Sequence, residues 1–239
     1  MSLSRRRFLA ITGAATLTPY ILWETGKFPS SLDHIILGCD DLASGVALVE
    51  ERTGVRAALG GVHPDRGTAN ALLSFGEDHY LEILAPDPNA KSVQPSAVQQ
   101  VVMLKGLSSP RLMNWAVHTK DIDGLATKLR NLGVQIVGPL PGSRKRPDGR
   151  VLSWKRLVLA DDLQGVLPFF IEWSAASIHP SSDSPKGCNL DRWAAADKNS
   201  QELSNTFHKI GIDMLVEQNE KPQLRARLAG PRGVLAVTS

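Results

Sequence analysis

"LDHIILGCDDL" (32–42) and "LMNWAVHTKDI" (112–122) follow one pattern, and this repetition decides the fold. Each stretch begins as an apolar strand and runs into a turn that contains aspartate. A short amphipathic segment follows each of them, at 43–55 and at 124–134, and both segments end at a Gly–Val pair. Because glycine just past the last turn commonly ends a helix, the pattern predicts two copies of a strand followed by a helix.

The two copies also continue alike after the helix. A short strand, a loop and two further strands are predicted in each, and the last strand carries one acid, Glu82 or Glu172. Positions 34 and 114 of the first strands lie 80 residues apart, whereas the acids of the last strands lie 90 apart. The second copy is therefore about ten residues longer, and the Gly- and Pro-rich loop 138–150 is the natural place for them.

A third copy is present in a degenerate form. It has a strand at 190–197, a helix at 200–212 and three short strands up to the C-terminus. At the positions that match His34 and Glu82 it has Arg192 and Ala236, so we expect it to extend or cap the sheet without a site of its own.

These repeats predict an α+β fold. Residues 29–176 are expected to hold two paired βαβββ modules, at about 32–86 and 112–174, in a curved mixed sheet around a cavity. The degenerate third module, at 188–239, is expected to pack on the same domain.

The first 28 residues have a different character. Arg5 and Arg6 in "SRRRFL" (4–9) precede an apolar run from Phe8 to Trp23 that is 16 residues long, short of the roughly 20 that span a bilayer. The motif resembles a twin-arginine signal, and the alternative is a basic tail beside a core helix. We therefore expect the twin-arginine translocase as a partner and a periplasmic or cell-envelope location, with a membrane tether if the signal is not cleaved.

Charge and cysteine content limit the remaining possibilities. The formal net charge is +3, and it falls to zero without Arg5, Arg6 and Arg7, which argues against nucleic acid as a partner. An exported protein can pair its cysteines, here Cys39 and Cys188. Cys39 ends an apolar strand, however, which favours a buried free thiol.

The strands "LDHIIL", "YLEIL" and "FFIEW", in this order and spacing, resemble the vicinal oxygen chelate superfamily. More narrowly, "GGVHPDRGTANALLSFG" (60–76) and "PFFIEW" (168–173) resemble the glyoxalase-like domain family. The resemblance covers residues 32 to about 237 and implies paired modules, often with a divalent metal in the cavity. Superfamily members also often form dimers, so a homodimer is expected unless the third module covers that edge instead. It does not fix the reaction, because one fold hosts many chemistries.

The resemblance also implies metal ligands. Superfamily members take them from the first and last strands of two modules, and His34, Glu82 and Glu172 match three of these positions. Such nitrogen and oxygen donors suit Zn²⁺, Mn²⁺, Fe²⁺ or Ni²⁺, and a metal would remove the cost of burying two acids in apolar strands. Asn114, at the fourth position, departs from the usual His, Glu or Gln. Alternatively, His34 is a core histidine, Glu82 is an edge-strand charge, and the cavity has lost its metal.

Further candidates complete the expected site. Glu172 or His63 is the candidate proton shuttle, and His63 could instead ligate the metal or bind substrate. The expected substrate-binding residues are Asn70, Tyr80, Asn114, Trp115 and Trp173. The alternatives are that both tryptophans pack within the sheet and that Asn70 simply begins a strand.

Three function classes follow. The first is a metal-dependent lyase, isomerase or dioxygenase that acts on a small substrate with adjacent oxygens. The second is a cell-envelope protein that sequesters a small molecule without turnover, which the weak ligand Asn114 favours. The third is a structural or partner-binding module.

Overall fold

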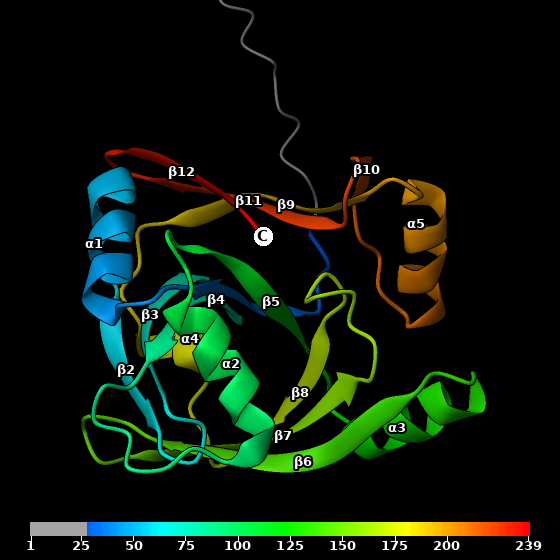
Figure 1. Cartoon of the computed structure of the whole chain (residues 1–239), viewed down its shortest axis with the longest axis horizontal. Coiled ribbons are helices and arrows are strands. Elements are labelled where there is room, and N and C mark those ends of the chain that lie inside the picture. Colours follow the sequence, from blue (N-terminus) through cyan, green and yellow to red (C-terminus); the bar gives the residue numbers. More distant parts are fainter. Residues whose placement is uncertain (1–27) are drawn as a thin grey trace, which may run out of the picture.

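The computed structural model describes residues 28–239, so the predicted signal lies outside the described residues. Both predicted βαβββ modules have the expected order of elements (Figure 1). The first comprises β1 (Leu32–Gly38), α1 (Leu42–Thr53), β2 (Ala58–His63), β3 (Thr68–Gly76) and β4 (His79–Pro86). Helix α2 (Pro95–Lys105) leads to the second, with β5 (Arg111–His118), α3 (Ile122–Asn131), β6 (Ile136–Lys145), β7 (Val151–Leu159) and β8 (Phe169–Trp173).

The turn residues that predicted the helices act as caps. Asp41 accepts the backbone N–H of Ser44 at 2.7 Å at the start of α1, and Asp121 accepts that of Gly124 at 2.8 Å in α3. Gly54 ends α1 at a φ of 81°, a left-handed conformation that glycine adopts without a steric cost. Local capping interactions therefore explain why a helix follows the first strand in each module.

The eight strands of the two modules close into one barrel in the order β1-β4-β3-β2-β6-β7-β8-β5. The first strands of the modules pair antiparallel, with Ile35 opposite Trp115, so the modules are related by an approximate twofold axis. In each module the first strand also pairs in parallel with the last strand, β1 with β4 and β5 with β8. The predicted curved mixed sheet around a cavity is confirmed in this form.

The third module forms a sheet of its own. After the short helix α4 (Pro180–Asp183) come β9 (Asn189–Asp197), α5 (Ser200–Lys209), β10 (Val216–Gln218), β11 (Gln223–Gly230) and β12 (Gly233–Thr238). Its strands follow the order β10-β9-β11-β12, so the first strand pairs with the second and third strands of its module and not with the last. The predicted order along the chain is present, but the sheet is assembled differently.

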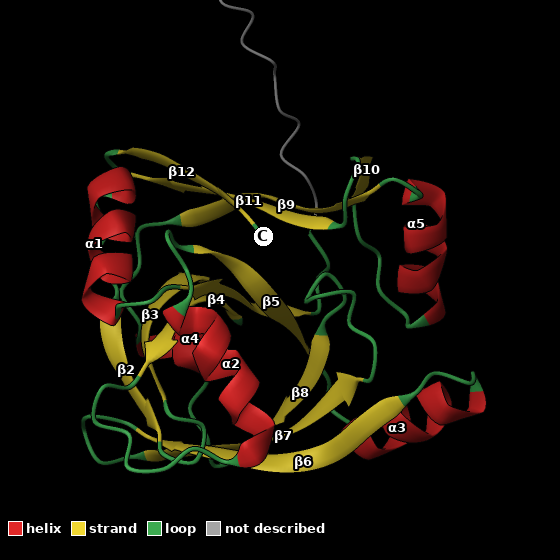
Figure 2. Ribbon diagram, in the orientation of Figure 1, coloured by secondary structure: helices red, strands yellow, loops and turns green. Residues whose placement is uncertain are grey.

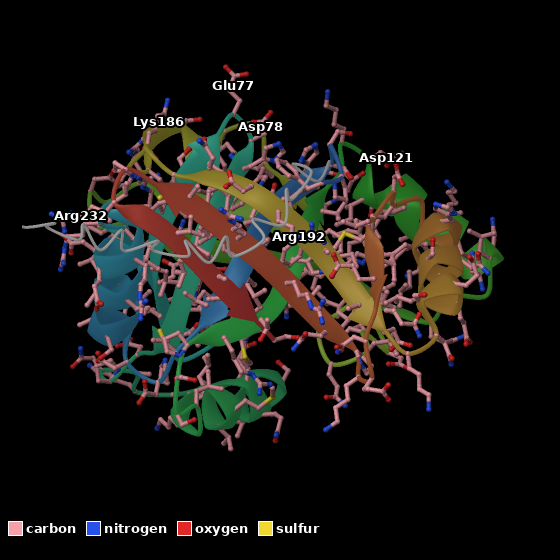
Figure 3. All side chains as sticks on the ribbon, turned by 90° about the horizontal axis from the view of Figure 1, so that it is seen from above. Glu77, Asp78, Asp121, Lys186, Arg192 and Arg232 are labelled. Carbon is pink, nitrogen blue, oxygen red and sulfur yellow. The ribbon has the colours of Figure 1, made fainter. Side chains whose placement is uncertain are left out.

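This sheet covers one side of the barrel, with α1 and α5 at its two ends (Figure 2). Its inner face is buried: Trp193 packs on Trp115 of β5 with ring centroids 5.4 Å apart, and Phe207 of α5 lies 6.1 Å from Trp115. Arg192 lies on the outer face, where it pairs with Glu217 (Figure 3). The third module therefore caps the barrel, and Arg192 points away from the core.

Two further features concern the described residues. Cys39 and Cys188 are both buried free thiols. Within residues 28–239, no helix combines the length and the hydrophobicity needed to cross a membrane.

Candidate functional site

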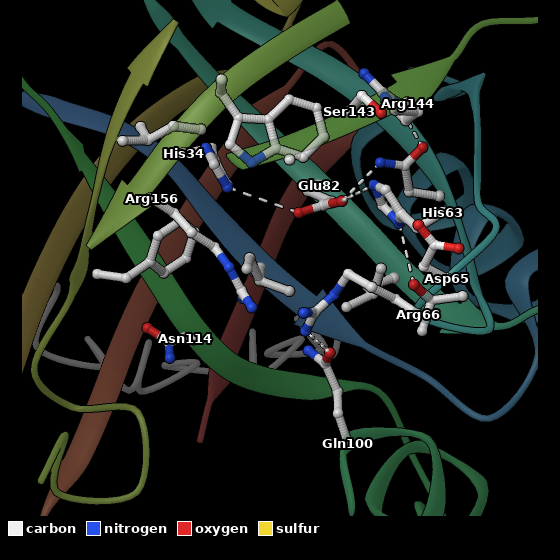
Figure 4. Close-up of a pocket in the computed structure, with 18 of the residues that line it drawn as sticks. His34, His63, Asp65, Arg66, Glu82, Gln100, Asn114, Ser143, Arg144 and Arg156 are labelled. Atoms are coloured by element: carbon white, nitrogen blue, oxygen red, sulfur yellow. Dashed lines mark hydrogen bonds and ion pairs between the residues drawn. The ribbon is translucent and has the colours of Figure 1, made fainter. Parts of the chain in front are cut away.

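Strands of both modules enclose a cavity of about 330 Å³ inside the barrel. Its wall is polar on the side of the first module, where His34, His63 and Glu82 lie (Figure 4). A cavity of this size lies at the small end of ligand-binding pockets. It therefore suits a small molecule.

His34 lies in the wall of the cavity, and the buried Asp33 holds it from behind. The pairing of β1 with β5 shifts register between Leu32 and His34, and a bulge of this kind re-aims side chains that would otherwise alternate. The fully buried Asp33 carboxylate accepts from His34 Nδ1 at 2.6 Å, from Trp173 Nε1 at 3.0 Å and from His179 Nε2 at 3.2 Å.

These bonds determine the charge of Asp33. Burial would raise the pKa of its carboxyl, but the bonds from His179 and His34 outweigh burial and hold the pKa well below its usual range. An ionised carboxylate only accepts hydrogen bonds, so Nδ1 of His34 carries a proton. Nε2 of His34 is then the atom that faces the cavity.

His34 Nε2 lies 3.6 Å from Glu82 Oε2, and two aromatic rings contact the imidazole. The Tyr80 ring stacks on the imidazole, with centroids 4.6 Å apart, and Phe169 contacts its edge at 5.6 Å. These contacts fix the plane of the imidazole, so His34 and Glu82 meet in a defined geometry.

A chain of hydrogen bonds holds Glu82 from its other side. Asn70 Nδ2 donates to Glu82 Oε1 at 2.6 Å, and Arg144 Nη1 donates to Asn70 Oδ1 at 2.6 Å. Because arginine only donates and a carboxylate only accepts, this is the amide orientation that satisfies both neighbours. Burial would raise the Glu82 pKa, but His34, His63, Asn70 and Arg144 together lower it below its ordinary value. Glu82 is thus a carboxylate at neutral pH.

His63 approaches Glu82 from the end of β2. Its Nε2 lies 4.0 Å from Glu82 Oε1, and its Nδ1 lies 3.0 Å from the hydroxyl of Thr68. Burial lowers the His63 pKa to about 4, although Glu82 acts in the opposite direction. His63 is therefore a neutral imidazole at neutral pH.

Four of the five predicted substrate-binding residues line this cavity: Asn70, Tyr80, Asn114 and Trp173. Trp115 does not. It is fully buried on the opposite face of β5, where Nε1 donates to the carbonyl of Val166 at 2.8 Å. The prediction for Trp115 was wrong because neighbouring residues of a strand point to opposite faces, and Asn114 already occupies the inner one.

The prediction that Glu172 shares the cavity with His34 and Glu82 was also wrong. Its carboxylate accepts the backbone N–H of Ile122 at the start of α3, at 2.7 Å, outside the barrel. The strand register explains the error. Ile36 pairs with Glu82, and Ala116, which lies 80 residues after Ile36, pairs with Phe169. The second-module equivalent of Glu82 is thus Phe169, 87 residues later, and not Glu172, 90 residues later.

The predicted ligand set therefore does not fit a divalent cation. Only His34 and Glu82 of the set face the cavity. At the fourth position, the side-chain amide oxygen of Asn114 already accepts the backbone N–H of Trp115 at 2.7 Å. No group of three or more His, Cys, Asp or Glu side chains in residues 28–239 has the geometry of a metal site.

Several residues of the site were missed from sequence. Asp33 was hidden because strand alternation places it opposite His34, and only the bulge brings the two together. Arg144 belongs to the stretch 138–150, which the sequence predicts as a Gly- and Pro-rich loop, whereas the structure places Arg144 on β6. Alternation in "VLSWKRLVL" (151–159) offered a usable signal, because it places Trp154 and Arg156 on one face, and both line the cavity.

Comparison with one solved structure supports the fold. A hypothetical protein from Staphylococcus aureus matches with a TM-score of 0.58 at 20% identity, over 87% of this chain and 84% of that one. Methylmalonyl-CoA epimerases also match, one from Streptomyces coelicolor at 21% identity and one from Mycobacterium tuberculosis at 18%, each with a TM-score of 0.43 over 63% of this chain. They cover 99% and 91% of those chains, respectively.

Curated protein sequences gave no match to this chain. The family model of the glyoxalase-like domain matches residues 32–230, which include the whole barrel and most of the third module. The chain therefore belongs to the glyoxalase-like domain family.

Proposed function

We propose that the barrel cavity binds a small organic molecule and moves a proton on it, with His34, positioned by Asp33, and Glu82 as the proton-transfer groups. The reaction class is that of an isomerase or lyase that breaks a C–H bond next to a carbonyl group. The observation that carries the proposal is the position of His34, bonded to a buried carboxylate through Nδ1 and 3.6 Å from Glu82 through Nε2.

The chemistry follows from this arrangement. A carboxylate behind an imidazole fixes its tautomer and stabilises the imidazolium that forms when Nε2 takes a proton. Glu82 lies beside Nε2 and can receive or return the same proton. His63, neutral at pH 7, is available as a hydrogen-bonding group on the other side of Glu82.

A second candidate function is binding without turnover. The lowered pKa of Glu82 favours it, because a carboxylate stabilised by four neighbours is a weak base. The two candidates differ in one measurable property, which is exchange of a carbon-bound proton.

The test uses a panel of small carbonyl compounds, charged and uncharged. Compounds that raise the melting temperature of the protein are incubated with it in D₂O, and loss of the C–H signal is followed by proton NMR. We expect exchange with wild type and a loss of at least a hundredfold with His34→Gln. His208→Gln, at an exposed position on α5, is the matched control. Binding without exchange in wild type would favour the second candidate.

We also propose export by the twin-arginine route, on the sequence motif around Arg5 and Arg6. Replacing both arginines by lysine, followed by cell fractionation, tests it. Unchanged delivery to the envelope would contradict the proposal.

A further inference from the structure

Arg156 is unusual among the inward-facing arginines. It lies on β7 and lines the cavity, yet within residues 28–239 its side chain has no hydrogen bond and no acidic partner. Two other partly buried arginines are paired with acids: Arg146 lies 2.9 Å from Asp183, and Arg225 lies 2.8 Å from Glu217. Arg156 is therefore a cation in the cavity wall that no acidic side chain of the described residues pairs with.

Arg66 brings a second cation to the same place. It follows His63 in the β2–β3 turn, and its Nη2 donates to Gln100 Oε1 of α2. Figure 4 shows Arg66 and Arg156 reaching toward each other from opposite sides of the cavity. Burial, and then repulsion by Arg66, lower the Arg156 pKa to about 10. Both groups remain cationic at neutral pH.

Gln100 supplies a further donor beside the two guanidinium groups. Because Gln100 Oε1 accepts from Arg66, its amide N–H₂ remains for a ligand. Glu82 attracts Arg66 electrostatically, but its oxygens already face Asn70, His34 and His63. Two like charges in a partly enclosed cavity repel, and an anion between them converts repulsion into attraction.

We propose that Arg156 and Arg66, with Gln100, form a subsite for an oxyanion group of the substrate, which is therefore a small organic acid. Guanidinium groups bind carboxylate or phosphate through paired hydrogen bonds. With the oxyanion held there, the rest of the molecule extends toward His34 and Glu82. This inference rests on the proposed function only in placing substrate in the same cavity.

The binding test compares three probes: malonate, inorganic phosphate and uncharged malonamide. Melting temperature and calorimetric affinity are measured for wild type, Arg156→Gln, Arg66→Gln and the control Arg111→Gln, which is exposed at the start of β5. We expect malonate or phosphate, but not malonamide, to stabilise wild type and the control. Arg156→Gln and Arg66→Gln should each bind at least about tenfold more weakly. Preference for malonate identifies a carboxylate, and preference for phosphate identifies a phosphate ester.

A second measurement needs no ligand. At low salt, Arg156→Gln should raise the melting temperature of the empty protein, and the same substitution should raise it less in the Arg66→Gln background, where the repelling cation is absent. The subsite is overturned if neither anion stabilises wild type more than malonamide, or if the variants bind as wild type does. Anion binding that persists in His34→Gln, with proton exchange lost, separates the subsite from the proton-transfer proposal.

Discussion

The first and second modules of the barrel place different side chains at equivalent positions. His34 of β1 corresponds to Asn114 of β5, and Glu82 of β4 corresponds to Phe169 of β8. The backbone pairing is the same in both, but the first module contributes an imidazole and a carboxylate, whereas the second contributes an amide and a ring.

The difference shows how a symmetric barrel acquires an asymmetric site. The first module supplies the groups suited to proton transfer, and the second supplies Arg144, Arg156 and the rings of Trp154 and Trp173. A buried acid is stable in the first module because donors surround it, and Phe169 avoids the need for donors in the second. The cavity therefore has a reactive side and a cationic, aromatic side.

Asp33 connects the two sides, so its removal should have the largest effect. It holds His34 of the first module and Trp173 of the second. Asp33→Ala should lower the free energy of unfolding by about 3–5 kcal/mol, because one buried and two partly buried donors lose an acceptor that lies in the core. Chemical denaturation measures this, with the exposed Asp40→Ala as control. A cost as small as that of the control would show that Asp33 does not connect the modules.

A second prediction concerns a substitution that makes the two modules alike at the position of Glu82. Phe169→Glu places a carboxylate at the position equivalent to Glu82, next to His34. Without metal it should destabilise the protein by about 3 kcal/mol, because a ring is lost and two acids repel. Zn²⁺, Mn²⁺, Fe²⁺ or Ni²⁺ should then recover about 2.7 kcal/mol at a hundredfold excess over the dissociation constant.

Thermal unfolding with chelator and with each metal measures both effects. Wild type should not respond to any of the four ions. A response of wild type as large as that of the variant would restore the metal site that the sequence predicted.

The elements were predictable because their signals are local. Strand alternation and the caps at Asp41 and Gly54 act within a few residues. The direction of Glu172 is not a local property. We aligned it with Glu82 by residue type, at an offset of 90, whereas the pairing of β5 with β8 gives 87. The error of three residues is odd, and an odd shift moves a strand residue to the opposite face.

The bulge at Asp33 and the strand order of the third module were also unpredictable, because they too depend on contacts between distant parts of the chain. The bulge at Asp33 depends on how β1 meets β5, which lies about 80 residues away in the chain. The third module has the element order of the others, but β9 pairs with β10 and β11 while its Trp193 packs on Trp115 of the barrel. Sequence patterns specify which segments become strands more strongly than which strands become neighbours.

The buried His63 of the first module makes stability depend on pH. The folded His63 has a pKa of about 4 against an ordinary value of 6.5, so the unfolded chain binds a proton first as pH falls. The resulting stability is complete above about pH 6.5 and is lost toward pH 4, by about 3 kcal/mol in total. His63→Asn should flatten the decline in this window, as measured by denaturation at several pH values. The carboxyls of Asp33 and Glu82, whose pKa values are lowered, act only at more acidic pH. An unchanged slope in the variant would contradict the assignment to His63.

The hydrogen bond from Arg144 of the second module to Asn70 of the first can be disrupted by adding a side chain at Gly60 of β2. A Cβ at Gly60 would lie within van der Waals overlap of Arg144 Nη1 and Asn70 Oδ1, because no side chain separates β2 from this pair. Gly60→Ala should displace Arg144 and cost about 1–2 kcal/mol of stability. Gly106→Ala, whose added Cβ would meet atoms no closer than 3.6 Å, is the control. Equal melting temperatures for the two variants would show that the Arg144–Asn70 bond adds nothing.

The smallest effect is expected at the acid that the sequence placed in the cavity. Glu172→Gln keeps an acceptor for the N–H of Ile122 but removes a negative charge from the start of α3. It should cost about 0.5–1 kcal/mol, the usual value for a charge at a helix terminus, and leave proton exchange and malonate binding unchanged. Glu82→Gln is the matched comparison from the first module. It should abolish proton exchange, because the carboxylate beside His34 Nε2 is lost. If Glu172→Gln lowers exchange as strongly as Glu82→Gln, the two acids act together and the asymmetry between the modules is wrong.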